Sequence, residues 1–254
     1  MKYRSVWISD VHLGTNACKT DLLRSFLKQL DTEKLYLVGD IVDGWALKSK
    51  WFWPPEHNEI VRLLLKMSKT TQVIYVAGNH DETLRQFCPL QLGNVDVRTY
   101  TVHETLKGKR MVVLHGDIFD SFVTNLKHVA VLGSVAYDAL IAANNATHWF
   151  AKKFGLPYWS LAEWLKTHAR EAMKAIGRFE AAAAGYAKNK GFDGVIAGHL
   201  HHATIREIGG TTYVNCGDWV SSCTAIVEDE AGELKLIRWA EEVKRLPIEL
   251  EESV

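Results

Sequence analysis

The feature that most constrains this chain is a short apolar run at residues 34–38 that ends directly in Gly39-Asp40-Ile41-Val42-Asp43. A short apolar run bounded in this way predicts a buried β-strand. A strand that ends in Gly-Asp presents a carboxylate at its C-terminal edge, where open α/β sheets bind their ligands. Four other apolar runs end similarly, and the polar residues that follow the five runs are Asp10 and His12, Asp40 and Asp43, Asn79 and His80, His115, and His199 and His201. We therefore expect these side chains to gather at one edge of a sheet.

The first eighty residues alternate between strand and helix patterns. The predicted strands are 6–9, 34–38 and 72–77, and the predicted helices are 20–30 and 55–69. The helices show apolar spacings of three and four, and Pro55 suits the first turn of the second one. The residues expected on the inner face of that second helix are Ile60, Val61, Leu64 and Leu65. This alternation predicts parallel βαβ units.

The pattern changes after Asp81. Strands are expected at 95–101 and 110–114, followed by a helical segment over 121–190 with joints at 156–157 and Gly177. The strands predicted after this segment are 194–197, 204–208, 211–216, 223–227 and 234–239, with Gly209-Gly210 as a tight turn. We therefore expect a core formed by residues 1–120 and 191–254, interrupted by a helical insertion at 121–190.

Composition excludes several classes of protein. The 254 residues include 30 Lys and Arg against 30 Asp and Glu, so no overall positive charge points to nucleic acid. Four cysteines without C-x-x-C spacing predict free thiols in a reducing compartment. No apolar signal core or membrane-spanning run is apparent, so we expect a cytoplasmic protein.

The polar clusters have the chemistry of metal ligands. In extended backbone, residues two apart point to the same side, which predicts that Asp10 and His12 act together, as do His199 and His201. Carboxylate, imidazole and amide groups suit manganese, iron or zinc. We interpret Asp40 as an oxygen bridge between two such ions. Two metals about 3.5–4 Å apart can share a hydroxide and clamp a phosphate group, which predicts phosphoryl chemistry.

The motifs D-x-H, G-D-x-x-D, G-N-H-D, H-G and G-H-x-H occur in this order from Asp10 to His201. The pattern resembles the calcineurin-like metallophosphoesterases. The resemblance implies a four-layered α/β/β/α sandwich of two packed sheets. It also implies ligand sets for two divalent ions, with manganese as the first candidate and iron or zinc as alternatives. One set is Asp10, His12, Asp40 and His201, and the other is Asp40, Asn79, His115 and His199. By the same resemblance His80 stabilises or protonates the leaving group and is held by Asp81 or Asp43.

A narrower resemblance is to the UDP-2,3-diacylglucosamine pyrophosphohydrolases of lipid A synthesis. Chain length, the S-D-x-H-L start and the insertion after H-G-D are similar. In that family the insertion forms a cap over the metals and takes up acyl chains. This chain departs from the pattern because it has His80 where that family usually has Arg. The family's C-T-D-D-x-x-Y run after H-G-D is also replaced by Ile118-Phe119-Asp120-Ser121-Phe122.

The predicted cap suggests how a lipid-linked nucleotide could bind. Its aromatic residues would form an acyl groove, with basic residues holding phosphates or anionic headgroups at the inner-membrane surface. The substrate-binding residues expected on this basis are Asn79, His80, Lys152, Lys153, Trp159, Lys166 and Arg170. An equal alternative is that the aromatic residues only pack the insertion against itself or against a second subunit.

Other residues have less specific interpretations. Asp43 could cap a helix or orient His80, and the segment 215–218 could border the site or form a turn. Ordinary surface or core roles are expected for His57, His103, His128, His148 and His168. Three functions remain open: hydrolysis of UDP-2,3-diacylglucosamine, phosphodiesterase or phosphatase activity on a soluble nucleotide or phosphoprotein, and a non-catalytic scaffold.

Overall fold

The computed structural model of this protein describes the chain at residues 1–122 and 161–244, with side chains at 1–121 and 170–244. The chain divides into two compact units, residues 1–117 with the segment from 183 onward, and residues 118–182. The first unit contains every strand found in the described residues. The second contains most of α5 (Leu161–Asn189), and within it Phe119 packs edge-to-face on Phe179 with ring centroids 5.5 Å apart.

The first sheet has seven strands in the order β12-β11-β1-β2-β3-β5-β4. Its strands are β1 (Lys2–Ile8), β2 (Asp31–Val38), β3 (Gln72–Val76), β4 (Leu90–Leu92), β5 (Val95–Arg98), β11 (Thr224–Glu228) and β12 (Leu234–Arg238). Strands β1, β2, β3 and β5 run parallel, as the βαβ pattern predicts, whereas β4, β11 and β12 pair antiparallel with their neighbours. The sheet is therefore mixed, with a parallel centre.

The second sheet has five strands in the order β6-β7-β8-β10-β9. Its strands are β6 (Thr101–Glu104), β7 (Arg110–Val113), β8 (Gly194–Ala197), β9 (Thr204–Ile208) and β10 (Thr211–Asn215). Here too the central strands β7, β8 and β10 are parallel, and the two edge strands are antiparallel. The parallel strands of each sheet end at a common edge of that sheet.

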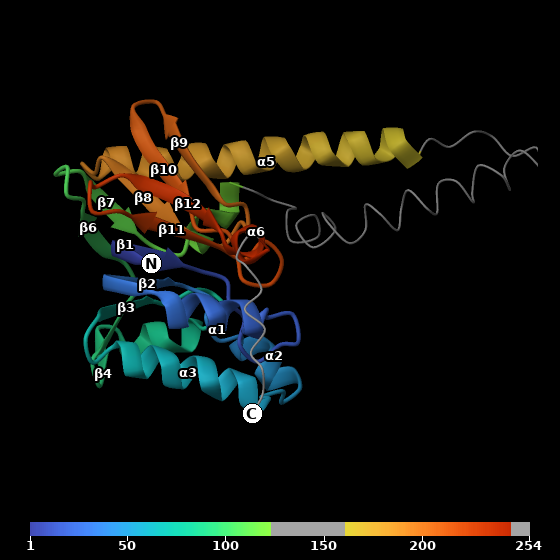
Figure 1. The fold of residues 1–254 in the computed structure, drawn as a ribbon. Helices are drawn as coiled ribbons and strands as arrows, with labels where there is room; N and C mark the ends of the chain where they lie inside the picture. The colour runs from blue at the N-terminus through green and yellow to red at the C-terminus, as the bar shows by residue number, and fades with distance from the viewer. Residues whose placement is uncertain (123–160, 245–254) are drawn as a thin grey trace, which may run out of the picture. The chain divides into compact units, whose positions relative to one another are not determined.

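The two sheets pack face to face, as alternation along β1 shows. Trp7 belongs to a core shared with Met111 and Ile196 of the second sheet, while Val6 and Ile8 point to the opposite face. That opposite face is covered by α1 (Thr20–Gln29) and α3 (Pro55–Met67), which lie together below the first sheet in Figure 1. The residues of α5 that belong to this unit lie beside β8 and β10 (Figure 1), with Ala183 and Ala187 buried. The predicted α/β sandwich of four layers is thus confirmed.

Several local predictions need correction. Leu65 is 51% exposed, because the inner face of α3 is centred on Ile60 and Leu64. Helix α5 continues through Gly177, so this glycine is not a joint. The run 95–101 divides between β5 and β6, which lie in different sheets. The short helices that the sequence did not predict are α2 (Gly44–Ser49), η1 (Glu82–Phe87), η2 (Asp117–Phe122) and α6 (Trp239–Val243).

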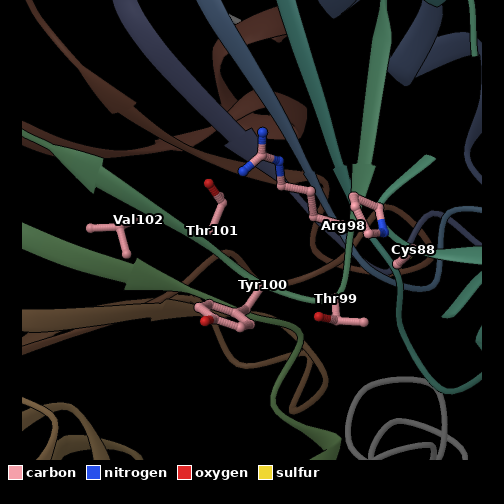
Figure 2. A pocket seen from close by; sticks show the side chains of 7 residues that line it. Cys88, Arg98, Thr99, Tyr100, Thr101 and Val102 are labelled. Carbon is pink, nitrogen blue, oxygen red and sulfur yellow. The ribbon is translucent and has the colours of Figure 1, made fainter. Parts of the chain in front are cut away.

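Further observations concern a surface pocket and the cysteine thiols. A pocket of about 440 Å³ is lined by residues 88–89 and 98–102 (Figure 2), and no predicted site residue lines it. Cys18, Cys88, Cys216 and Cys223 are all free thiols, as expected.

Within the described residues, no helix has the length and apolar character needed to cross a bilayer. The predicted insertion at 121–190 stays a prediction, since residues 123–160 lie outside the part of the chain that the structure describes.

Candidate metal centre

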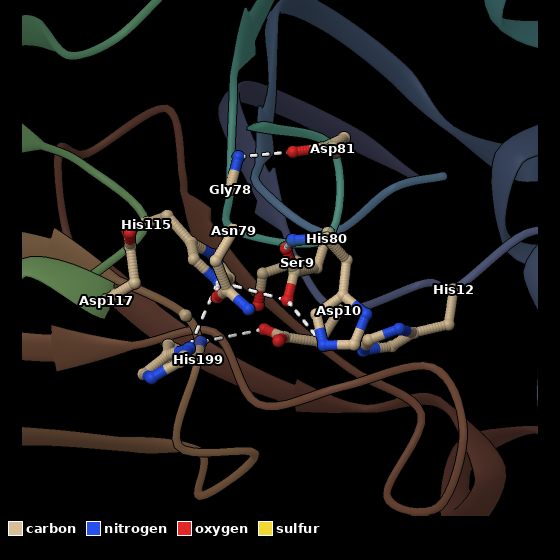
Figure 3. A network of polar contacts seen from close by, with 12 residues as sticks. Ser9, Asp10, His12, Gly78, Asn79, His80, Asp81, His115, Asp117 and His199 are labelled. Atoms are coloured by element: carbon tan, nitrogen blue, oxygen red, sulfur yellow. Dashed lines mark hydrogen bonds and ion pairs between the residues drawn. The ribbon is translucent and has the colours of Figure 1, made fainter. Parts of the chain in front are cut away.

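The predicted ligands come together at the carboxyl ends of five strands. They follow β1, β2 and β3 of the first sheet and β7 and β8 of the second. In Figure 3 the side chains of Asp10, Asn79, His80, His115 and His199 turn towards one another. Three groups bring their ligand atoms within 4.8 Å of one another: Asp10, His12 and His201; His12, Asp40 and His80; and Asp40, His115 and His199. The residues of these groups are buried or half-buried, so their polar atoms are partly removed from water.

His115 lies at the centre of the third group. Its Nε2 atom is 3.2 Å from Asp40 Oδ2, 3.2 Å from Asn79 Oδ1 and 3.2 Å from His199 Nδ1. Its other ring nitrogen, Nδ1, lies 3.0 Å from the carbonyl oxygen of Val38. A carbonyl oxygen only accepts hydrogen bonds, so Nδ1 carries a proton and Nε2 of the neutral ring keeps its lone pair. That lone pair and the neighbouring oxygens face a common point, an arrangement that favours a cation there.

The electrostatics of His115 agree with this preference for positive charge. Burial by itself lowers the pKa of the imidazole, but the carboxylates of Asp40 and Asp10 outweigh burial and raise the pKa to about 10. The reciprocal effect lowers the pKa of Asp40, although burial opposes it. In the metal-free protein a proton on His115 therefore supplies the positive charge that the surrounding carboxylates favour.

The first group is built around Asp10, whose side chain is fully buried. Its Oδ1 atom lies 3.1 Å from His201 Nε2, and its Oδ2 atom accepts a hydrogen bond of 2.9 Å from the backbone N–H of His199. Burial raises the pKa of Asp10. The neighbouring His201, His115 and His12 have the opposite and larger effect, so the pKa lies well below the usual range of a carboxyl group. Asp10 is thus a buried, ionised carboxylate that could serve as an oxygen ligand.

The backbone is left-handed at five of the candidate ligand residues, which corrects the basis of one prediction. The positive φ angles are 53° at Asp10, 54° at His12, 54° at Asp40, 67° at His199 and 53° at His201. Spacing by two does not bring these pairs together through extended backbone. Each such residue costs on the order of 1–3 kcal/mol, and strain of this kind concentrates at functional sites. The loops after β1 and β2 hold the strain by pairing with each other, for example from His12 N–H to Asp40 O at 2.9 Å.

Glycines in the motifs leave room for the ligands. At Gly39, where φ is +79°, an added Cβ would overlap the ring of His115. At Gly78 an added Cβ would overlap the carboxylate of Asp40. The motifs therefore place glycine beside the ligand residues because a side chain would occupy the ligand's position.

Asp43 fulfils both roles that the sequence left open. Its Oδ1 atom accepts a 2.7 Å hydrogen bond from Ala46 N–H and caps α2. Its Oδ2 atom lies 3.0 Å from His80 Nδ1 and 3.0 Å from His12 Nδ1. A carboxylate that pairs with Nδ1 of an imidazole leaves Nε2 directed at the site. Asp43 thus sets the orientation of two rings.

Asp81 does not share this role. Of the two residues predicted to hold His80, Asp43 and Asp81, it is therefore not the one that pairs with the ring. Its described hydrogen bonds come from Gly78 N–H, from the Tyr75 hydroxyl at 2.5 Å and from Ile41 N–H at 3.0 Å. Figure 3 shows the carboxylate turned to Gly78. Asp81 therefore ties the loop after β3 to the loop after β2, and Asp43 alone of the two contacts His80. Burial raises the pKa of Asp81.

One residue beside the site was not assigned a role from the sequence. The ring of Trp45 lies over His80 with centroids 4.2 Å apart and is 41% exposed. The only signal for it was an aromatic residue two positions after the end of G-D-x-x-D. The segment 215–218 does border the site, since Asn215 donates to Gly198 O at 2.6 Å and Asp218 Oδ2 lies 3.8 Å from His201 Nδ1.

The remaining candidates lie elsewhere or outside the described residues. Arg170 is exposed on α5, and the side chains of Lys166 and His168 on the same helix are not described. The candidates that lie outside the described residues are Lys152, Lys153, Trp159, His128 and His148. His57 is buried and accepts a hydrogen bond from Gly14 N–H at 3.1 Å. His103 is also buried, between Tyr36 and Glu228.

The donor set fits two divalent cations. Carboxylate oxygens, imidazole nitrogens and an amide oxygen are ligands for manganese, iron or zinc. Asp40 belongs to two of the three groups, which places it between the Asp10 and His115 sides of the centre. The His and Asp groups are therefore consistent with a dinuclear metal site.

Known proteins resemble this chain in sequence and fold. The UDP-2,3-diacylglucosamine hydrolase of Blochmanniella pennsylvanica is 28% identical over 137 residues, which cover 50% of this chain and about half, 54%, of that protein. The enzyme of the same name from Haemophilus influenzae is 24% identical, with 92% of this chain and 98% of that protein covered. Among solved structures, an archaeal phosphodiesterase matches with a TM-score of 0.44 and 15% identity, covering 92% of this chain and 98% of that one. The model of the calcineurin-like phosphoesterases matches residues 3–203, and the chain belongs to that family.

Proposed function

We propose that this protein hydrolyses a phosphoanhydride or phosphoester bond, with UDP-2,3-diacylglucosamine or a close lipid-linked nucleotide as its substrate. The observation that carries the proposal is the convergence of ionised carboxylates and oriented imidazoles around Asp40. Membership of the family makes the protein a metal-dependent phosphoester hydrolase. The finer assignment of substrate is supported by the two similar hydrolases and by nothing in the site itself.

In this proposal Asp10, His12, Asp40 and His201 would hold one cation, and Asp40, Asn79, His115 and His199 the other. Two divalent ions, for which manganese is the first candidate, supply a water of lowered pKa and neutralise charge on the phosphate group. The protein's part is to fix the ligand atoms before substrate binds. Val38 sets the tautomer of His115, and Asp43 sets that of His12.

His80 would act on the leaving group. Asp43 holds a proton on His80 Nδ1, and the ring's Nε2 atom lies 3.9 Å from Asp40 Oδ2, on the side of the metal ligands. Burial lowers the pKa of His80, but Asp43 and Asp40 raise it above its ordinary value, which favours the protonated ring. When water adds to phosphorus and the bond to the leaving oxygen breaks, His80 can give its Nε2 proton to that oxygen.

A second candidate is hydrolysis of a soluble phosphoester, with no part for a lipid. The observation that favours it is His80 of the G-N-H-D motif, which contacts Asp43 and Trp45. In the lipid-linked alternative, Lys152, Lys153, Trp159, Lys166 and Arg170 of the insertion would contact the substrate at the inner-membrane surface. The non-catalytic alternative is disfavoured by the complete set of ligand residues.

The deciding experiment offers both kinds of substrate to the purified protein with Mn²⁺. Release of UMP from UDP-2,3-diacylglucosamine in detergent micelles, followed by ³¹P NMR, is the expected result. The same protein treated with EDTA provides the control. Turnover of aryl phosphates without UMP release would reject the lipid-linked substrate, and absence of both bound metal and turnover would reject the enzyme.

A further inference from the structure

Arg85, in η1, makes contacts that connect two ligand-bearing loops. Its Nη1 and Nη2 atoms donate to Asp117 Oδ2 and Oδ1, each at 2.7 Å, which forms a bidentate ion pair. The same guanidinium donates to the carbonyl oxygen of Ala77, from Nε at 3.2 Å and from Nη2 at 2.9 Å. One side chain therefore contacts two separate stretches of the chain.

Those two stretches bear neighbouring members of the metal centre. Ala77 directly precedes Gly78 and Asn79 after β3 of the first sheet, and Asp117 follows His115 by two residues after β7 of the second. Asn79 and His115 are themselves in contact, with Oδ1 and Nε2 3.2 Å apart. Arg85 therefore joins the edges of the two sheets beside this pair of ligands.

The chemistry of the link requires arginine. A guanidinium presents several donors in a fixed plane and can engage a carboxylate and a carbonyl together, whereas a lysine ammonium acts as a single point charge. The side chains of Arg85 and Asp117 are 30% and 14% exposed, so the pair is partly shielded from water.

We propose that Arg85 and Asp117 form a positioning pair that sets the separation of Asn79 and His115 and thereby the affinity of the second metal site. The inference rests on the proposed dinuclear centre and gives a role to Arg85, which lies in none of the motifs, and to Asp117, the last residue of H-G-D. Groups that orient metal ligands typically change metal affinity by about 10–100-fold when they are removed. The Asp10, His12 and His201 group has no described contact with the pair and keeps its affinity.

The test is a Mn²⁺ titration of the metal-free full-length protein by calorimetry, with electron paramagnetic resonance to detect spin-coupled Mn²⁺ pairs. Wild type should bind two ions and give the coupled signal. Arg85→Gln should weaken the binding of one of the two ions about 10–100-fold and leave the affinity for the other unchanged, with the coupled signal lost at low Mn²⁺. Asp117→Asn should behave alike, and the double variant should be little worse than either single one, because both remove the same interaction.

Arg98→Gln is the matched control. Arg98 also pairs with an aspartate, Asp96, at 2.7 Å, but both residues lie on β5, so this pair joins no loops. The Arg98→Gln variant should leave both Mn²⁺ affinities unchanged. Arg85→Lys keeps the charge and serves if Arg85→Gln fails to fold; it too should weaken the second ion.

Distinct outcomes overturn the two proposals. If wild type does not bind two ions, the proposed dinuclear function fails. If wild type binds two ions and both Arg85 variants bind them equally well, the positioning role alone fails. Equal weakening of both ions, with a lowered melting temperature, would show a general structural role and would also overturn the inference.

Discussion

Oδ2 of Asp43 lies 3.0 Å from Nδ1 of His80, so a helix-capping carboxylate also orients the ring proposed to protonate the leaving group. His80→Ala should therefore lower kcat by about 10²–10⁴-fold, the usual contribution of a general acid. Both Mn²⁺ ions should remain bound, as measured by mass spectrometry of the metal content. His202→Ala, at a histidine outside the three ligand groups, is the control and should be active. Loss of metal from His80→Ala would make His80 a ligand rather than an acid.

Asp40→Ala should abolish activity, because Asp40 belongs to two of the three groups and faces His115 at 3.2 Å. The metal content should fall from two ions to one or none. Asp96→Ala removes an aspartate from a surface pair and should keep both ions and full activity. An Asp40→Ala protein that still binds two ions tightly would contradict a shared ligand.

Gly39→Ala should destabilise the protein more than Gly210→Ala does. The two glycines have φ of +79° and +81°, so alanine meets the same left-handed backbone cost of roughly 1–2 kcal/mol at each. Only at Gly39 does the new Cβ overlap His115, since nothing lies within 4 Å of Gly210. The extra loss should be about 1–3 kcal/mol in urea denaturation, with weaker Mn²⁺ binding. Equal losses for the two variants would show that His115 moves aside freely.

The buried pair of His103 and Glu228 should make the stability of the metal-free protein depend on pH. Burial lowers the pKa of His103 below its ordinary 6.5, more than Glu228 raises it, and the positive charges of Lys34 and Arg4 lower it further. Because the folded pKa lies below the unfolded one, this contribution is present above pH 6.5 and is lost as pH falls through the folded pKa.

The measurement compares the free energy of unfolding near pH 7.5 and pH 5.5 in wild type and His103→Gln, which cannot titrate. Wild type should lose at most about 1.4 kcal/mol more per pH unit below the unfolded pKa than the variant loses. An identical pH dependence in the two proteins would mean that other groups account for it.

The amino-acid sequence was enough to predict parallel βαβ units and the positions of the polar loops, and the family resemblance of its motifs implied the sandwich. Apolar runs that end in Asp or His specify both a buried strand and a polar strand end, because burial and ligand chemistry act on adjacent residues. It also determined that Asp43 stands beside the site, although it left open whether the residue caps a helix or orients His80. Its contacts with Ala46 and His80 show that it does both.

Only the tertiary structure decided how these residues meet. The left-handed backbone at Asp10 and His199, the choice of Asp43 over Asp81 as the partner of His80, and the link from Arg85 to Asp117 all depend on loops from different strands packing together. Local sequence does not encode such relationships, because spacing fixes directions only along regular backbone. Residues 85 and 117 are brought together by two sheets whose strand ends converge, and that convergence is a property of the packed chain.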